Sequence, residues 1–210
     1  MQRRTLSLGV LAAPAAILAG RVLAPAPAWA QDGWDPGVTE FDFVKGDADA
    51  PVTVIEYASL TCGHCASFHT DTLPGLTDRY LDPGHVRLVF RQFPLNRVDL
   101  QAGMLARCLP EDRFFGFVDV LFKTQSTWAG AQDPTAALAQ LGRTAGLSDA
   151  RIEECLADQD LADRIVQVRL EAEAAYQISA TPTFVIDGEA FAGNRPLSFF
   201  AEQLDPLIET

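Results

Sequence analysis

Apolar residues in the first half of the chain follow strand spacing and helical spacing in turn. A β-branched run at 52–57 continues through 58–61 and predicts a strand, and the apolar run at 85–93 predicts a second strand. Between them, residues 65–81 have helical spacing, with Pro74 as a kink or break. These segments together predict one βαβ unit.

The stretch from 96 to 176 has helical periodicity and no run of strand type. Asp133, which is followed by Pro134, and Ser148 are typical residues at the start of a helix. The four or five helices expected here lie at 98–109, 111–124, 133–146, 149–157 and along 161–172.

Strand character returns near the end of the chain, at 183–186 and 189–192. Asp187-Gly188 lies between these runs and is typical of a tight hairpin turn. The apolar pattern of 196–208 predicts a closing helix. The order of elements therefore predicts an α/β fold that is interrupted by an all-helical insertion.

The first thirty residues have the layout of an export signal. Arg3 and Arg4 precede an uncharged apolar run and a Pro/Ala-rich stretch that ends with small residues at Ala28 and Ala30. We expect 1–30 to be a signal peptide that is cleaved after Ala30, which would place the protein in the periplasm; an uncleaved anchor is the alternative. The paired arginines are compatible with twin-arginine export as well as with the Sec route.

Composition and charge narrow the function classes. The 210 residues are 48% hydrophobic and 21% charged, which excludes a disordered chain and fits one domain with an insertion. The formal net charge of -12 argues against nucleic acid or anionic lipid as a partner, because both require a cationic surface. Four cysteines are too few for a small scaffold held by disulfides.

The four cysteines divide into two pairs by their spacing. Cys62 and Cys65 are separated by Gly63 and His64 and form a self-contained CxxC motif, which leaves Cys108 and Cys155 for each other. The second pair can face the core of the helical insertion, so we expect a structural disulfide there. Two buried free thiols and a second redox centre are the alternatives.

The CxxC motif carries the candidate chemistry. A cysteine at the first turn of a helix faces unpaired backbone N–H groups and the positive end of the helix dipole, so the thiolate of Cys62 is favoured. His64 adds a nearby donor or positive charge. Because a stabilised thiolate favours the reduced form, this pattern predicts a disulfide that is readily given away.

Other uses of a CxxC motif are tested by its neighbours. Ala66 stands where c-type haem attachment requires a histidine. A zinc site could include His69, but no second CxxC or histidine pair lies nearby, so we expect neither a metal nor a cofactor. A purely structural disulfide in so short a loop would constrain almost no chain. We expect His69 and His85 on the surface and Trp128 in the core.

Two motifs together resemble those of a known family. The segment 56–65, with Glu56 on the predicted strand and the CxxC motif at its end, and the segment 181–184 (Thr-Pro-Thr-Phe) are similar to those of thiol-disulfide oxidoreductases of the DsbA type. The resemblance implies a thioredoxin fold, a mixed central sheet flanked by helices. It divides the chain into a thioredoxin-like domain at 31–95 and 177–210 and a helical insertion at 96–176.

The resemblance also implies roles for three further residues. Pro182 would be a cis-proline beside the CxxC motif, and the backbone of Thr181 would pair with a substrate peptide. Glu56 would lie beneath the active site and move protons to and from Cys65. From the residues alone, Pro182 could simply begin a strand, and Glu56 could face solvent or be buried with a raised pKa.

These observations predict an enzyme that donates the Cys62–Cys65 disulfide to exported, folding proteins through a mixed disulfide on Cys62. The resemblance implies reoxidation by a membrane quinone-linked oxidase, and we expect a monomer that binds no nucleic acid. The main alternative is a disulfide isomerase or reductase that is kept reduced. A peptide-binding or metal-carrying module is a further alternative. A peroxidase or transferase of the same fold would need a different pocket, and nothing in the sequence indicates one.

Overall fold

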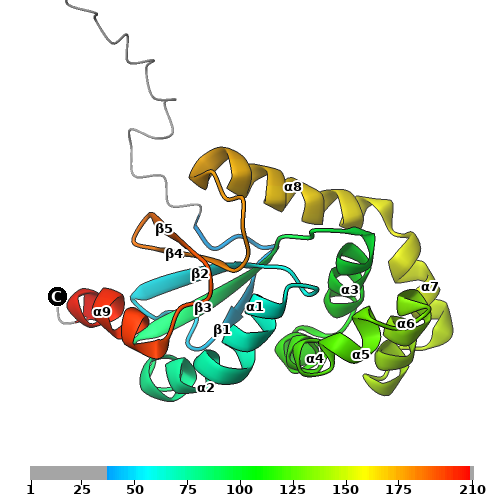
Figure 1. The fold of residues 1–210 in the computed structure, drawn as a ribbon, viewed down its shortest axis with the longest axis horizontal. Coiled ribbons are helices and arrows are strands. Elements are labelled where there is room, and N and C mark those ends of the chain that lie inside the picture. The colour runs from blue at the N-terminus through cyan, green and yellow to red at the C-terminus, as the bar shows by residue number, and fades with distance from the viewer. Residues whose placement is uncertain (1–36, 209–210) are drawn as a thin grey trace, which may run out of the picture.

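The computed structural model of the chain describes residues 37–208, so the expected signal peptide at 1–30 lies outside the described residues. Figure 1 shows a central sheet with helices on both sides and a cluster of helices beside one end of it. The sheet has five strands in the order β1-β3-β2-β4-β5. The strands are β1 (Phe43–Lys45), β2 (Val52–Ala58), β3 (Val86–Gln92), β4 (Thr183–Ile186) and β5 (Glu189–Ala192).

Both strand directions occur in this sheet. β2 is parallel to β3, as the predicted βαβ unit requires, and β4 is antiparallel to β2. β4 and β5 form the predicted hairpin, and the turn residue Asp187 has a positive φ of 47°. β1 adds an antiparallel edge beside β3. The predicted α/β fold with a mixed central sheet is confirmed.

The helical run between β2 and β3 covers 63–81, close to its predicted extent. Pro74 lies in the first turn of a short α-helical piece, where its missing N–H costs no hydrogen bond. The run therefore continues past the proline and changes its hydrogen-bonding pattern instead of ending. Its successive pieces are α1 (Gly63–Ser67), the π-helical η2 (Phe68–Thr72), α2 (Leu73–Leu76) and the π-helical η3 (Thr77–Leu81).

The middle of the described chain is helical from 97 to 176, with no strand in it. Asp133 and Ser148 cap their helices with side-chain oxygens, as predicted. The short helix that carries Trp128 was not predicted as a separate element. The helices are α3 (Arg97–Arg107), α4 (Glu111–Lys123), α5 (Gln125–Ala129), α6 (Pro134–Thr144), α7 (Asp149–Ala157) and α8 (Gln159–Tyr176).

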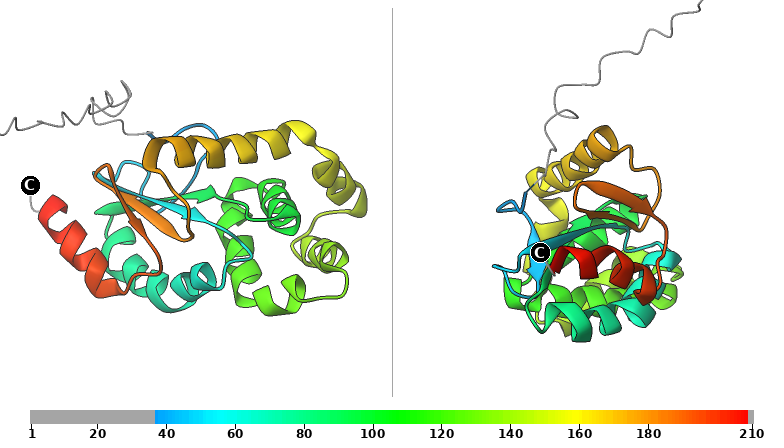
Figure 2. Two further views of the ribbon diagram at one scale, coloured as in Figure 1. Left: turned by 45° about the horizontal axis from the view of Figure 1, so that its top comes forward. Right: turned by 90° about the vertical axis from the view of Figure 1, so that its left-hand side faces the viewer.

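The sheet has a helical layer on each face. Val54, Leu88 and Phe184 lie on the face that packs against the α1–η3 run and the closing helix α9 (Leu197–Ile208). Val89 and Val185 lie on the other face and pack against α8, which crosses the sheet on that side in both views of Figure 2. The helices α3–α7 have a core of their own that continues into the sheet at Phe90, so the insertion is packed directly against the end of β2 where the CxxC motif lies.

Candidate active site

Cys62 and Cys65 lie at the beginning of α1, directly beyond the end of β2. Cys62 is the N-cap residue, with extended backbone and a half-buried side chain, whereas Cys65 is fully buried one turn later. Both cysteines are free thiols in this structure. Gly63 and His64 between them are exposed, so the motif presents one accessible sulfur and one protected sulfur.

The accessible sulfur is the acidic one. The thiol of Cys65 donates a hydrogen bond to it, and this donor contributes most to lowering the pKa of Cys62 to about 5. Burial opposes the shift, whereas Thr181 and the backbone N–H groups of Cys65 and His64 support it. The backbone N–H groups are donors that the start of a helix supplies to a negative group, whereas Thr181 lies in the loop that enters β4. Cys62 is therefore a thiolate at neutral pH.

The protected sulfur has the opposite preference. Burial raises the pKa of Cys65, and the neighbouring Cys62 and the charge of Glu56 raise it further. A thiolate on Cys65 is therefore unfavourable and has to take up a proton when it forms. The chemistry of the motif requires a route for that proton.

The second predicted motif lies against the first. The peptide bond between Thr181 and Pro182 is cis, and both residues are buried in the loop that enters β4. The Sγ atom of Cys62 lies 3.3 Å from the carbonyl oxygen of Thr181. The fold therefore brings together Cys62, Thr181 and Pro182, which the sequence analysis had singled out separately.

Glu56 is fully buried in β2, where it is paired with Phe90 of β3 and Phe184 of β4. Its carboxylate oxygens lie 3.0 and 3.2 Å from Nε2 of His69. Of the two orientations considered for Glu56, the structure has the buried one. The carboxylate is held by a histidine partner on the helical run that begins with the CxxC motif.

The prediction that His69 lies on the surface is wrong. Its side chain is 2% exposed, because it lies one helical turn after Cys65 and points to the same side, toward the sheet. Its ring packs against Phe122 at an interplanar angle of 31° with 4.2 Å between ring centroids, and its Nδ1 faces Asp119 of α4 at 3.8 Å. Burial alone lowers the pKa of His69, but Glu56 and Asp119 outweigh burial and raise it. His85 is exposed and Trp128 is buried, as predicted.

A buried carboxylate that the sequence analysis missed holds the loop before Cys62. Asp99 of α3 accepts hydrogen bonds from Ser59 Oγ, from the backbone N–H of Leu60 at 2.7 Å and from the backbone N–H of Leu95 at 2.9 Å. Asn96 caps the same helix by accepting from the N–H of Asp99. The spacing of Asn96 and Asp99 resembles a helix-start signature and could have indicated the helix, but not the loops that Asp99 binds.

The insertion also contacts the backbone of the active site. Nε2 of Gln125, in α5, donates to the carbonyl oxygen of Leu60 at 2.8 Å and to that of Cys62 at 3.0 Å. Both carbonyl groups belong to the turn between β2 and α1. Gln125 was not singled out in the sequence analysis, because no motif marks a side chain that binds only backbone.

The other cysteine pair lies within the insertion. Cys108, at the end of α3, is bonded to Cys155 of α7, and the two residues are 47 positions apart in the sequence. Cys155 is buried in the core of the insertion. This disulfide is distinct from the CxxC motif and joins two helices that pack against each other.

The described residues provide neither a metal site nor a membrane span. Between residues 37 and 208, no group of three or more His, Cys, Asp or Glu side chains is arranged to hold a metal ion. No helix in that range is both long and apolar enough to cross a membrane.

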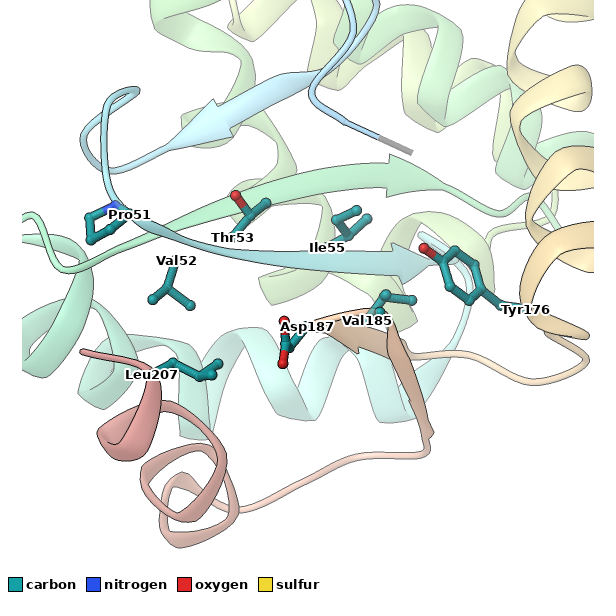
Figure 3. Close-up of a pocket in the computed structure, with 9 residues that line it drawn as sticks. Pro51, Val52, Thr53, Ile55, Tyr176, Val185, Asp187 and Leu207 are labelled. Atoms are coloured by element: carbon teal, nitrogen blue, oxygen red, sulfur yellow. The ribbon is translucent and has the colours of Figure 1, made fainter. Parts of the chain in front are cut away.

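A pocket of about 380 Å³ lies along the first half of β2, away from the cysteines. Figure 3 shows Pro51, Thr53 and Ile55 along its strand side and Tyr176 at one end. None of the predicted site residues lines this pocket. The candidate chemistry therefore lies at an open surface around Cys62 rather than in a pocket for a small molecule.

Comparisons with known proteins agree with this geometry. A family model described as Thioredoxin matches residues 39–206. A Rickettsia bellii protein, provisionally named a protein-disulfide oxidoreductase, is 29% identical over 173 residues, which are 82% of this chain and 66% of that protein. The chain thus spans slightly less than two thirds of that relative's length.

Solved structures extend the similarity to three dimensions. Alpha-DsbA1 of Wolbachia pipientis is 30% identical, with a TM-score of 0.75 over 82% of this chain and 93% of that chain. Oxidised BdbD of Bacillus subtilis has a TM-score of 0.72 over 80% of this chain and 94% of that chain, and at 21% identity it is similar in fold. The helical insertion as well as the sheet lies within these matched regions.

Proposed function

Because the chain belongs to the thioredoxin family and to its DsbA type, we propose that it is a thiol-disulfide oxidoreductase that donates the Cys62–Cys65 disulfide to other proteins. One observation carries the proposal: the two sulfurs of one short motif have opposite environments. Cys62 is accessible and its pKa is lowered to about 5, whereas Cys65 is buried and its pKa is raised.

This asymmetry supports a defined order of bond exchange. A substrate thiolate attacks the Sγ atom of Cys62, the bond between Cys62 and Cys65 breaks, and Cys65 leaves and takes up a proton. A second substrate thiolate then attacks its own partner sulfur in the mixed disulfide, and Cys62 leaves as a stable thiolate. The substrate dithiol becomes a disulfide, and the disulfide of the protein becomes a dithiol.

The surroundings of Cys62 support a protein substrate. The carbonyl oxygen of Thr181 lies 3.3 Å from Sγ and can accept a backbone N–H of a peptide when Cys62 is in a mixed disulfide. Exposed Gly63 and His64 on the other side leave room for an extended chain. In this scheme Thr181 and Pro182 bind substrate, and Glu56 serves the proton of Cys65.

The proposed setting of the reaction rests on the sequence of 1–30. Its export-signal layout supports action in the periplasm on proteins that fold after export. A membrane quinone-linked oxidase is the proposed partner for reoxidation, and the protein is proposed to act as a monomer.

The decisive experiment measures the redox potential of the Cys62–Cys65 couple by equilibration with glutathione, together with oxidation of a reduced two-cysteine peptide. We expect a couple more oxidising than the glutathione pool, stoichiometric peptide oxidation, and a trapped mixed disulfide in Cys65→Ser. Cys62→Ser should form no mixed disulfide, whereas the Cys108→Ser/Cys155→Ser double variant should retain activity. A strongly reducing potential, or a motif that is reduced in cells, would instead indicate the isomerase or reductase.

A further inference from the structure

Three titratable side chains from three elements form a row of neighbours that begins at Glu56, whose charge acts on the buried thiol of Cys65. Glu56 of β2 is followed by His69 of η2 and then by Asp119 of α4. His69 Nε2 lies 3.0 Å from Glu56, and His69 Nδ1 lies 3.8 Å from Asp119. The exposed fraction of the side chains rises along the row, from 0% at Glu56 to 2% at His69 and 35% at Asp119. The row therefore ends at solvent.

The disulfide exchange alone does not explain why a histidine is buried at position 69. Burying a titratable ring is costly unless both of its nitrogens are used, yet Nδ1 is buried and makes no hydrogen bond. Its polar neighbour in that direction is Asp119, at a distance that a single water molecule or a small movement of the carboxylate would close. This arrangement is costly for a structural contact but suitable for a group that changes its proton during a reaction.

We propose that His69 and Asp119 pass protons between Glu56 and solvent, so that the buried Cys65 can gain and lose its proton while the active site is covered by substrate. This inference rests on the proposed function, because it concerns the proton of the same CxxC motif. His69 is the relay residue, and Asp119 is the outlet on the helical insertion.

The proton steps balance in both directions. When Cys65 leaves as a thiolate, the Glu56 carboxylate takes the Nε2 proton of His69 and passes it to Cys65, and the His69 ring takes up a proton from the side of Asp119. When Cys65 attacks during reoxidation, the same transfers run in reverse. Only protons move along this row, and the electron pairs stay with the sulfurs.

The other neighbours of the His69 ring are aromatic side chains, which cannot carry a proton to solvent. Phe68, Phe90 and Phe122 surround the ring, with centroid distances of 5.4, 5.8 and 4.2 Å. The charged groups that face the ring are Glu56 from β2 and Asp119 from α4. Asp119 in turn faces Lys45 of β1 and Lys123 of α4, which favour its charged form and lower its pKa together with His69. Within the described chain, Asp119 is thus the titratable group through which the ring reaches solvent.

The test uses the reaction of the protein's own cysteines with oxidised glutathione. The rate of closure of the Cys62–Cys65 disulfide from the glutathione mixed disulfide is measured against pH, in water and in deuterium oxide. His69→Gln keeps a side-chain amide beside Glu56 but cannot relay a proton, and Asp119→Asn removes the outlet. Asp71→Asn is the matched control, because Asp71 is an exposed carboxylate on the same element as His69.

We expect His69→Gln to slow closure at neutral pH by about 100-fold, within the usual range for general acid–base catalysis, and to make the rate proportional to hydroxide. Asp119→Asn should slow it by a smaller factor and enlarge the solvent isotope effect, and Asp71→Asn should leave the profile unchanged. Unchanged profiles in both His69→Gln and Asp119→Asn would overturn the relay. If His69→Gln does not fold, the profile and isotope effect of the more exposed Asp119→Asn decide the question.

This assay separates the relay from the proposed function. Closure with glutathione needs no protein substrate, so the relay can fail while peptide oxidation is normal. Conversely, a protein that closes its disulfide through His69 but does not oxidise peptides would contradict the donor role alone.

Discussion

The sulfur of Cys62 lies 3.3 Å from the carbonyl oxygen of Thr181, although the two residues are 119 positions apart in the sequence. The antiparallel pairing of β2 with β4 produces this contact, because Tyr57 at the end of β2 is opposite Thr183 at the start of β4. The loop that enters β4 is therefore held over the first turn of α1. The same pair of strands thereby positions both the sulfur that can form a mixed disulfide and the backbone acceptor for the attached peptide.

The pKa of Cys62 is the first measurable consequence. We expect the reduced protein to gain its thiolate ultraviolet absorbance with a midpoint near pH 5, and alkylation of Cys62 to follow the same curve. The folded pKa is lowered, so the stability that the thiolate adds to reduced protein is full above the ordinary thiol pKa of about 8.5 and is lost as pH falls through about 5. Cys62→Ser should abolish the transition, and a midpoint near that of a free thiol would contradict the assignment.

His69 should make stability depend on pH in the opposite direction. Its pKa is raised in the folded protein, so its contribution is full below the unfolded value of about 6.5 and is lost as pH rises through the folded value. We expect His69→Gln to lower the free energy of unfolding by about 1.5–3 kcal/mol in mild acid, because a hydrogen bond between charged groups is lost, and by less at alkaline pH. Urea unfolding across pH measures this, with exposed His85→Gln as the control. Equal losses at all pH values would be inconsistent with a charged His69.

The buried ion pair between Asp42 and Arg91 should contribute more to the stability of the fold than an exposed ion pair does. Arg91 donates to Asp42 at 2.7 and 2.9 Å, and the two side chains are 6% and 1% exposed, respectively. We expect Asp42→Ala to cost about 3–5 kcal/mol, because it leaves a buried guanidinium without its charged partner. Asp149→Ala breaks an exposed ion pair with Arg143 and should cost at most about 1 kcal/mol. Similar losses in both variants, measured by denaturant unfolding, would refute this explanation.

The disulfide between Cys108 and Cys155 should stabilise the fold without tuning the reactive pair. Its closed loop corresponds to at most about 4 kcal/mol of chain entropy, so the Cys108→Ser/Cys155→Ser variant should unfold at lower denaturant concentration. The thiolate titration of Cys62 should stay where it is in the unmodified protein. A shift of that titration would instead mean that the insertion transmits the state of its disulfide to the active site.

Local patterns in the sequence predicted most elements of the fold. The runs at 52–57, 85–93 and 183–186 carry their own strand signals, and Asp187-Gly188 carries its own turn signal, so each could be recognised without knowledge of the rest. α5 was not predicted as a separate element, since a five-residue helix is too short for a periodic signal, and the three-residue edge strand β1 is marked only by the alternating Phe41 and Phe43. Their positions depend on partners outside these segments, because β1 pairs with β3 and α5 packs against α6 and α4.

The candidate site was predictable where a motif marks it and not where distant segments meet. The CxxC motif and Thr181-Pro182 were found directly. His69 was misplaced because its partners, Glu56 and Asp119, lie 13 positions before it and 50 positions after it, so nothing near His69 in the sequence indicates a buried site. Asp99 was missed for a similar reason, since it binds backbone N–H groups of residues that carry no sequence signal.

The hydrogen bonds from Gln125 to the carbonyl groups of Leu60 and Cys62 limit how this protein can be taken apart or recombined. A thioredoxin-like domain cut free of residues 96–176 would expose two backbone acceptors beside its reactive sulfur, even if a short linker closed the gap. Likewise, an insertion exchanged from another protein would have to supply its own donor at the position of Gln125. The helical segment and the CxxC turn must therefore be engineered as one unit.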